Sequence, residues 1–134
     1  MNQQWPTPYS VTSAPTDLVV ANNGSWSDAF QFGTPGDTSW SLVGTTFELE
    51  VKTSRYSTTP SLTLSVANGR ILILDPIARV IAFNVTPTDL QTSLSPGYYV
   101  YDLVMIEGLI ADPTATRVLL MHGKLQIVQG VTEV

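Results

Sequence analysis

The residues of this 134-residue sequence that could carry out chemistry are few, and the first of them is its one histidine. His122 lies in the apolar stretch 118–124, and any Ser-His-Asp arrangement would have to use it as the base. No Gly-x-Ser-x-Gly motif accompanies it. A single histidine inside a strand is more typical of a half-exposed strand residue, so we expect no catalytic residue in this chain.

The closest pair of acids in a regular pattern is Glu48 and Glu50. Two residues apart on a strand, they share one face and lie roughly 7 Å apart. Glycosidases instead place two carboxyl groups on opposite sides of the scissile bond. Because Lys52 continues the same row, we interpret these residues as a solvated ladder of alternating charge.

Metal and cofactor sites are also not expected. Asp75, Asp102 and Asp112 are candidate calcium ligands, but no segment places acids at alternate positions around a glycine. A zinc site of the usual ligands is not possible with no cysteine and one histidine. The turn with Gly33 and Gly36 lacks the lysine and the following helix of a phosphate-binding loop.

Aromatic residues leave one binding hypothesis open. Trp26, Trp40 and Tyr56 could stack on sugar rings, although Trp26 falls in a pattern typical of core residues. Recognition of carbohydrate on a host surface is therefore kept as an alternative function.

Composition describes an acidic, weakly charged chain. Its net charge is −5, and 13% of its residues are charged, against about 25% in an ordinary soluble domain. Nucleic-acid binding is not expected, because no basic face is present. Two interpretations of the weakly charged surface remain: a monomer with an unusual exterior, or a surface that neighbouring subunits cover, which we favour.

No targeting or membrane segment is visible. The N-terminal sequence MNQQWP lacks the basic and apolar regions of a secretory signal. The apolar stretches are far shorter than the ~20 residues of a membrane helix. We expect a protein that folds in the cytoplasm and binds neither membrane nor cofactor.

Residues 1–16 form the first of two expected parts. Three prolines among Trp5 and Tyr9 favour an extended, proline-rich N-terminal arm. Trp5 and Tyr9 are the candidate interaction residues of this arm, since large aromatic side chains require a surface to pack on. Residues 17–134 are expected to form a single domain.

Strand patterns fill that domain. In the segment 45–53 apolar residues alternate with charged ones, as in a half-buried antiparallel strand. Asn68-Gly69 predicts a β-hairpin between its flanking segments. The other predicted strands are 17–21, 25–32, 61–66, 70–74, 79–85, 98–106 and 117–128.

One segment predicts a helix. Thr86 is a candidate N-cap, Pro87 follows at the first helical position, and Asp89 lies in the first turn. Eight short strands with one short helical crossover near 86–93 predict an all-β protein, an immunoglobulin-like Greek-key β-sandwich. An all-β barrel is the alternative.

The turn after this helix resembles the tyrosine corner of immunoglobulin-like and fibronectin-like domains. There a tyrosine hydroxyl binds backbone upstream and holds the corner between the sheets. The spacing does not distinguish between two tyrosines for this role. The structural corner residues are Leu94, Pro96, Gly97, Tyr99 and Tyr101.

Four segments carry a family resemblance: TTFELEVKTSR, LSVANGRILILDP, RVIAFNVTPTDLQTSLSPGYYVYDLVMI and VLLMHGKLQIVQGVTEV. From Thr45 onward, about two-thirds of the chain, their pattern resembles a family of small structural proteins from the tails of tailed bacteriophages, of the kind seen in upper baseplate N-terminal domains. The arm at 1–16 and the segment 107–116 depart from the family pattern.

The resemblance implies a non-enzymatic virion component in the tail, the baseplate or a connector. It implies other virion proteins, and copies of this chain, as partners. Capsid decoration is the remaining virion role that the sequence does not separate from these.

Overall fold

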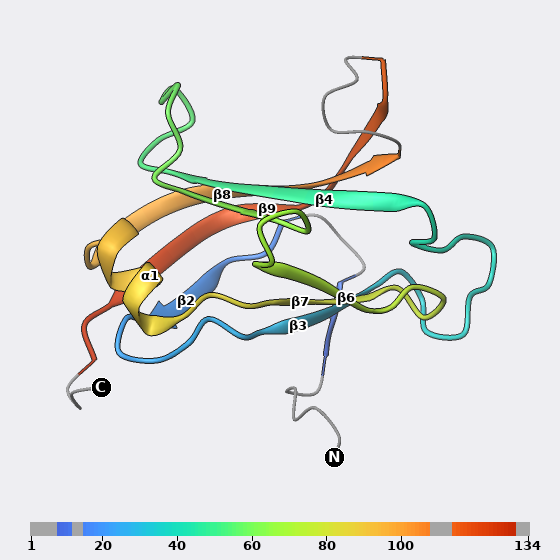
Figure 1. Cartoon of the computed structure of the whole chain (residues 1–134), viewed down its shortest axis with the longest axis horizontal. Helices are drawn as coiled ribbons and strands as arrows, with labels where there is room; N and C mark the ends of the chain where they lie inside the picture. The colour runs from blue at the N-terminus through green and yellow to red at the C-terminus, as the bar shows by residue number, and fades with distance from the viewer. Residues whose placement is uncertain (1–7, 12–14, 108–113, 131–134) are drawn as a thin grey trace.

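The computed structural model of this chain describes residues 8–11, 15–107 and 114–130 (Figure 1). Within these ranges it contains one short helix and a series of β-strands. The elements are β1 (Tyr9–Val11), β2 (Leu18–Ala21), β3 (Ala29–Phe32), β4 (Thr45–Lys52), β5 (Leu62–Ser65), β6 (Ile71–Asp75), β7 (Val80–Phe83), α1 (Pro87–Ser93), β8 (Gly97–Glu107) and β9 (Thr116–Val128).

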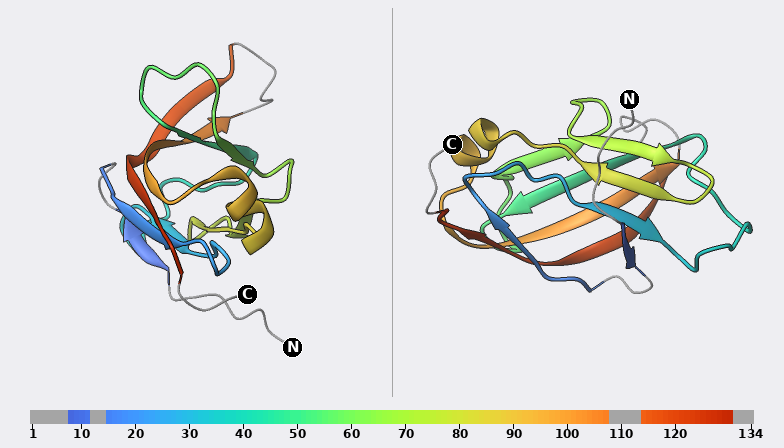
Figure 2. Two further views of the ribbon diagram at one scale, coloured as in Figure 1. Left: turned by 90° about the vertical axis from the view of Figure 1, so that its left-hand side faces the viewer. Right: turned by 90° about the horizontal axis from the view of Figure 1, so that it is seen from below.

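The strands form two sheets that pack against each other as a sandwich (Figures 1 and 2). Sheet A has the order β1-β3-β7-β6, and sheet B has the order β2-β9-β8-β4-β5. Neighbouring strands are antiparallel except for β1 with β3 and β2 with β9, which are parallel. The expectation of an all-β sandwich with one short helix is therefore confirmed, and the barrel alternative is wrong.

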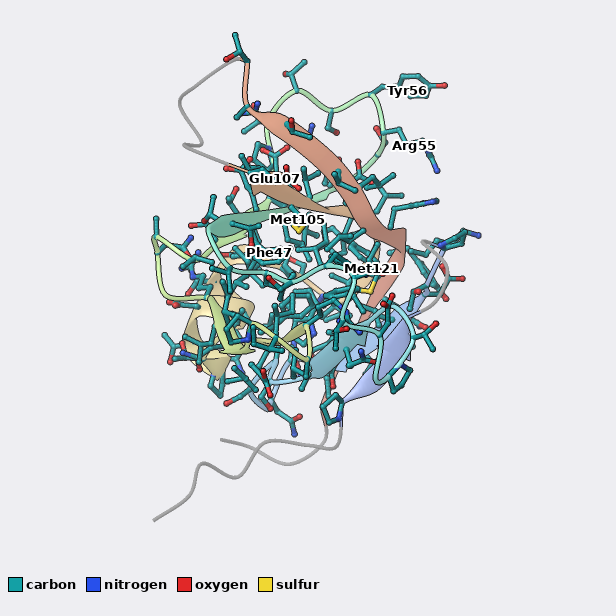
Figure 3. All side chains as sticks on the ribbon, turned by 90° about the vertical axis from the view of Figure 1, so that its right-hand side faces the viewer. Phe47, Arg55, Tyr56, Met105, Glu107 and Met121 are labelled. Atoms are coloured by element: carbon teal, nitrogen blue, oxygen red, sulfur yellow. The ribbon has the colours of Figure 1, made fainter. Side chains whose placement is uncertain are left out.

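Alternation along the strands produces the core between the sheets. In β4, Phe47, Leu49 and Val51 are fully buried, whereas the charged residues between them face outwards. Figure 3 shows Phe47 inside the body with Met105 of the neighbouring strand β8 and Met121 of β9, the next strand in the sheet. Every second residue of a strand points to the same face, so the period-two pattern of the sequence leads directly to this layer.

Aromatic side chains fill the sheet A half of the core. The ring of Phe83 on β7 lies 5.0 Å from Trp26, edge to face, and 5.1 Å from Phe30 on β3. Trp26 is almost fully buried, as its sequence pattern indicated. Such tilted ring pairs are favoured by the aromatic quadrupole and stabilise the core beyond their buried area.

Helix α1 connects sheet A to sheet B where the sequence predicts a crossover. The Thr86 side chain accepts a hydrogen bond from Asp89 N at 3.2 Å, and Pro87 occupies the first turn. The helix ends where Leu94 N donates to Leu90 O at 2.8 Å. Its buried residue Leu90 attaches it to the core. No helix in the described part of the chain has the length and the apolar character to cross a membrane.

The prediction of a hairpin at Asn68-Gly69 is wrong. The turn forms, with Gly69 at φ 78°, but it connects β5 of sheet B to β6 of sheet A, and each strand pairs elsewhere. An Asn-Gly pair specifies a tight turn, and the partners of the flanking strands are decided by which face each strand buries.

The N-terminal segment is paired with both sheets in its described residues. Strand β1, which contains Tyr9, lies beside β3, and Thr16 N donates to His122 O of β9 at 2.8 Å. Most of the predicted arm at 1–16 lies outside the described residues, so its boundary stays a prediction. The two parallel pairings place the start of the chain along one side of the sandwich.

Gly123 of β9 makes this pairing possible. The chain at Thr16 and Asp17 crosses so close to Gly123 that a Cβ there would overlap the Thr16 carbonyl. Lys124 N also donates to the Asp17 carboxylate at 2.9 Å. Glycine is required because backbone approaches backbone without space for a side chain.

We expect Gly123→Ala to destabilise the fold by about 1–3 kcal/mol, because the methyl group displaces the segment at Thr16 from β9. Urea denaturation measures the change. Gly24→Ala is the matched control, since a Cβ at Gly24 meets no atom within 4 Å. Equal stability of the two variants would contradict this account.

Candidate interaction surface

The turn between α1 and β8 is held by Tyr99. Its hydroxyl donates to Ser95 O at 2.7 Å, four residues upstream. Leu94 is fully buried in the core, Pro96 is exposed, and Gly97 starts β8 with a φ of 151°, a value that favours glycine. Together these contacts fix the angle at which the chain enters sheet B.

Tyr101 makes a different contact from the same strand. It is buried, and its hydroxyl donates to Thr16 O at 2.5 Å. Burial raises the pKa of this phenol, and the charges of Asp17 and Asp102 raise it further. The hydroxyl therefore stays protonated and remains a donor to the N-terminal segment. The sequence did not distinguish Tyr99 from Tyr101 as the corner tyrosine. In the structure Tyr99 binds the turn before β8, and Tyr101 binds the N-terminal segment.

Charged residues line up across the outer face of sheet B. Register pairs Glu50 of β4 with Asp102 of β8, and Asp102 with His122 of β9. The next row pairs Lys52 with Val100, and Val100 with Lys124. These rows give the face an acidic band beside a basic one.

A shallow pocket of about 210 Å³ lies on this face. Glu50, Lys52, Arg55, Asp102 and His122 are among the residues that line it. The Lys52 Nζ lies 3.8 Å from Glu50 Oε1, so the ladder of alternating charge does form an ion pair. Exposed pairs of this kind contribute little to stability, typically below about 1 kcal/mol. The pocket offers groups of both signs to a partner.

The candidate metal ligands are dispersed. Asp75 Oδ1 accepts from Ile77 N and Ala78 N at 3.1 and 3.0 Å and so closes the β6–β7 turn. Asp102 lies on β8, and Asp112 is outside the described residues. Within the described ranges, no group of three His, Cys, Asp or Glu residues could hold a metal ion.

The aromatic residues considered for sugar binding do not converge. Trp26 is in the core, and Trp40 lies under the guanidinium of Arg79 at 5.1 Å. Tyr56 stands alone on the loop after β4, beside Arg55 and 93% exposed (Figure 3). Of the arm residues, Trp5 lies outside the described residues, and Tyr9 lies in β1.

Arg79 is the structural residue that the sequence analysis missed. It is buried at a φ of 62°, and its guanidinium donates to five backbone carbonyls that surround it. These belong to Phe32 at 2.8 Å, Thr34 at 2.9 Å, Asp37 at 2.5 Å, Trp40 at 3.2 Å and Ile77 at 3.3 Å. The loop 33–44 is therefore organised around one cation. The sequence feature that could have indicated this role is a single basic residue close to the Asp75-Pro76 turn.

Nearby groups accommodate this buried charge. Hydrogen bonds from Ser39 hold the pKa of Asp37 below its usual value, and the charge of Arg79 lowers it further.

Burial raises the pKa of Asp28, and the neighbouring Trp26 indole offsets this only in part. That indole N–H is buried without a hydrogen bond of normal geometry among the described residues.

The outer edge of β5 is closed by its own connection to β6. Asn68 Oδ1 accepts from Ser65 N, and Asn68 Nδ2 donates to Thr63 O, both at 3.0 Å. Arg70 Nη1 donates to the same Thr63 carbonyl at 3.1 Å, and Arg70 Nη2 binds Asp89 Oδ2 of α1 at 3.2 Å. Side chains thus occupy the backbone groups that another strand would need, which is a known protection of sheet edges.

The opposite edge of sheet B has no such cover. Strand β2 is the terminal strand there, and Val19 is 64% exposed. Asp17 and Ala21, which flank it at alternate positions, are exposed as well. Edge strands with free backbone groups and apolar side chains are sites for pairing with another chain.

No known protein-family model matches this chain, and no curated protein matches it. The fold and the surface therefore stand on their geometry alone.

We expect Tyr99→Phe to destabilise the protein by about 1 kcal/mol, because it removes the bond to Ser95 O and little packing. Tyr98→Phe is the matched control, since Tyr98 is 72% exposed. Thermal unfolding of both variants measures the difference. An unchanged midpoint for Tyr99→Phe would contradict a structural role for the corner bond.

We expect Arg79→Lys to cost about 3 kcal/mol, because an ammonium group cannot reach five carbonyls and leaves some buried without a partner. Hydrogen exchange should also accelerate in the loop 33–44. Arg55→Lys, at an exposed arginine, is the control and should change neither quantity. Slow exchange in the loop of the Arg79→Lys variant would show that other contacts hold it.

Proposed function

We propose that this protein is a non-enzymatic structural module of a tailed bacteriophage particle, located in the tail, the baseplate or a connector. It acts through contacts with other virion proteins and with copies of itself. The observation that carries the proposal is a stiff two-sheet body in which, among the described residues, no strand covers the β2 edge of sheet B.

We infer further that the sandwich is immunoglobulin-like. The order β1-β3-β7-β6 corresponds to strands A, B, E and D of that fold, and β9-β8-β4-β5 corresponds to G, F, C and C′. Helix α1 then lies between strands E and F, where the tyrosine corner belongs. The parallel pairing of β1 with β3 departs from an all-antiparallel pattern.

Rigidity supports a building-block role. Tyr99 holds the turn before β8, Tyr101 holds the N-terminal segment, and Arg79 holds the longest described loop. The bonds of Tyr101 and Arg79 join segments far apart in the chain, and the Tyr99 bond fixes a turn locally, so the body resists local deformation. A rigid part loses little conformational entropy when it enters an assembly.

The attribution to a phage particle rests on the family resemblance. Its four segments correspond to β4, to β5 with β6, to the stretch from β7 to β8, and to β9. They therefore specify the central strands and the corner. The segment 107–116, which departs from the family, begins at the end of β8 and leads to β9.

Purified phage particles, produced from the genome that encodes the chain, provide the test. We expect the protein to sediment with intact particles in a density gradient and an antibody against it to label the tail region in electron micrographs. Its absence from the particles would refute a virion role. Substrate turnover by the purified protein that is lost in His122→Gln would refute the non-enzymatic part of the proposal.

A further inference from the structure

The uncovered edge of β2 has a definite hydrogen-bonding pattern. Thr16 N donates to His122 O at 2.8 Å, and Asn22 N donates to Val128 O at 3.0 Å. In a parallel pair, alternate residues direct their backbone groups to the neighbouring strand. The backbone N–H and C=O groups of residues 16, 18, 20 and 22 therefore point towards β9. Those of Asp17, Val19 and Ala21 point away from it, to the outside of the sheet.

No other strand in the described part of the chain pairs with this outward side, although Ala21 O accepts a hydrogen bond from Gly24 N at 3.4 Å. Sheet B ends at β2, and the register of β2 on β9 runs without a bulge from Leu18 to Ala21. Figure 2 shows β2, in blue, beside β9, in red. The strand carries no lysine or proline within its bounds, so it lacks the usual protections of an edge.

We propose that β2 pairs antiparallel with β2 of a second copy of this chain, with the two-fold axis at Val19. This proposal rests on the proposed function, since it names the partner and the surface of that structural module. Pairing places Val19 opposite its own equivalent and Asp17 opposite Ala21 of the second copy. About six backbone hydrogen bonds join the copies, two of them to Ala21 carbonyls that also accept from Gly24 N of their own chain, and the two sheets B become continuous.

The edge is compatible with itself in charge and in shape. The two Asp17 carboxylates lie four residues apart along the paired strands, about 13 Å. Each already accepts a hydrogen bond from Lys124 N of its own chain. The two Val19 side chains, which water surrounds in the single chain, cover each other.

A second copy fits this edge because pairing of the two β2 strands forms a closed dimer. An isologous pair uses the same strand on both chains and leaves no further β2 edge. The other edge of sheet B is occupied by Asn68 and Arg70, so pairing through sheet B stops at two copies. Edge pairing buries little surface, and we expect a reversible dimer that the repeated contacts of a particle reinforce.

Val19→Lys tests the pairing in the full chain. The side chain is exposed, so the fold tolerates lysine, but two ammonium groups then meet at the two-fold axis. We expect sedimentation equilibrium to show a dimer for the unmodified protein and at least tenfold weaker dimerisation for Val19→Lys. Val43→Lys is the matched control, because Val43 is 65% exposed and lies in the loop before β4.

A cross-link places the axis independently. The chain contains no cysteine, so Val19→Cys introduces a single thiol. Opposite residues of an antiparallel pair have Cα atoms about 5.5 Å apart, within the range that a disulfide spans. Mild oxidation should join Val19→Cys into a covalent dimer at least tenfold faster than Val43→Cys.

A protein that stays monomeric at millimolar concentration, or a dimer that Val19→Lys leaves intact, overturns the proposal. If the monomer is nevertheless present in phage particles, the structural role stands and only the self-pairing falls. If a Val19-dependent dimer forms but is absent from particles, the pairing stands and the virion role falls.

Discussion

The position of β2 in this fold depends on the contacts that the N-terminal segment makes with β9. Thr16 receives the Tyr101 hydroxyl, its N–H binds His122 O, and Gly123 leaves the space that both contacts need. Thr16 lies directly before β2, so these contacts determine that β2 joins sheet B in parallel with β9. The exposed edge, and the surface that we assign to self-association, follow from it.

Two further sets of polar contacts fix the ends of the sandwich, and neither is a catalytic constellation. Arg79 gathers carbonyls from a loop that has little apolar side chain to bury, so a cation replaces the core there. At the other corner, Tyr99 binds the turn that follows α1. Buried polar groups are costly unless they have hydrogen-bond partners, and the buried guanidinium of Arg79 and the carbonyls around it provide partners for one another.

The two edges of sheet B illustrate opposite treatments of the same problem. Strand β5 is closed by Asn68 and Arg70, whereas β2 is open. The chain has few charged residues, so like-charge repulsion does little to keep copies apart. Under the self-pairing that we propose, the closed β5 edge and the open β2 edge limit each sheet B to one partner.

Much of the local structure was determined by the sequence alone. Alternation in 45–53 determined which side chains of β4 are buried, and the Thr86-Pro87 start determined α1, because both are short-range effects of backbone geometry. The turn at Asn68-Gly69 was local too, but its strands pair with partners distant in the chain. Only the tertiary structure decided that Tyr99 and Tyr101 act on different segments, that Arg79 is buried, and that β2 is the open edge. Each of these depends on which distant backbone comes within hydrogen-bond reach, and this is a property of the packed sheets that no local pattern encodes.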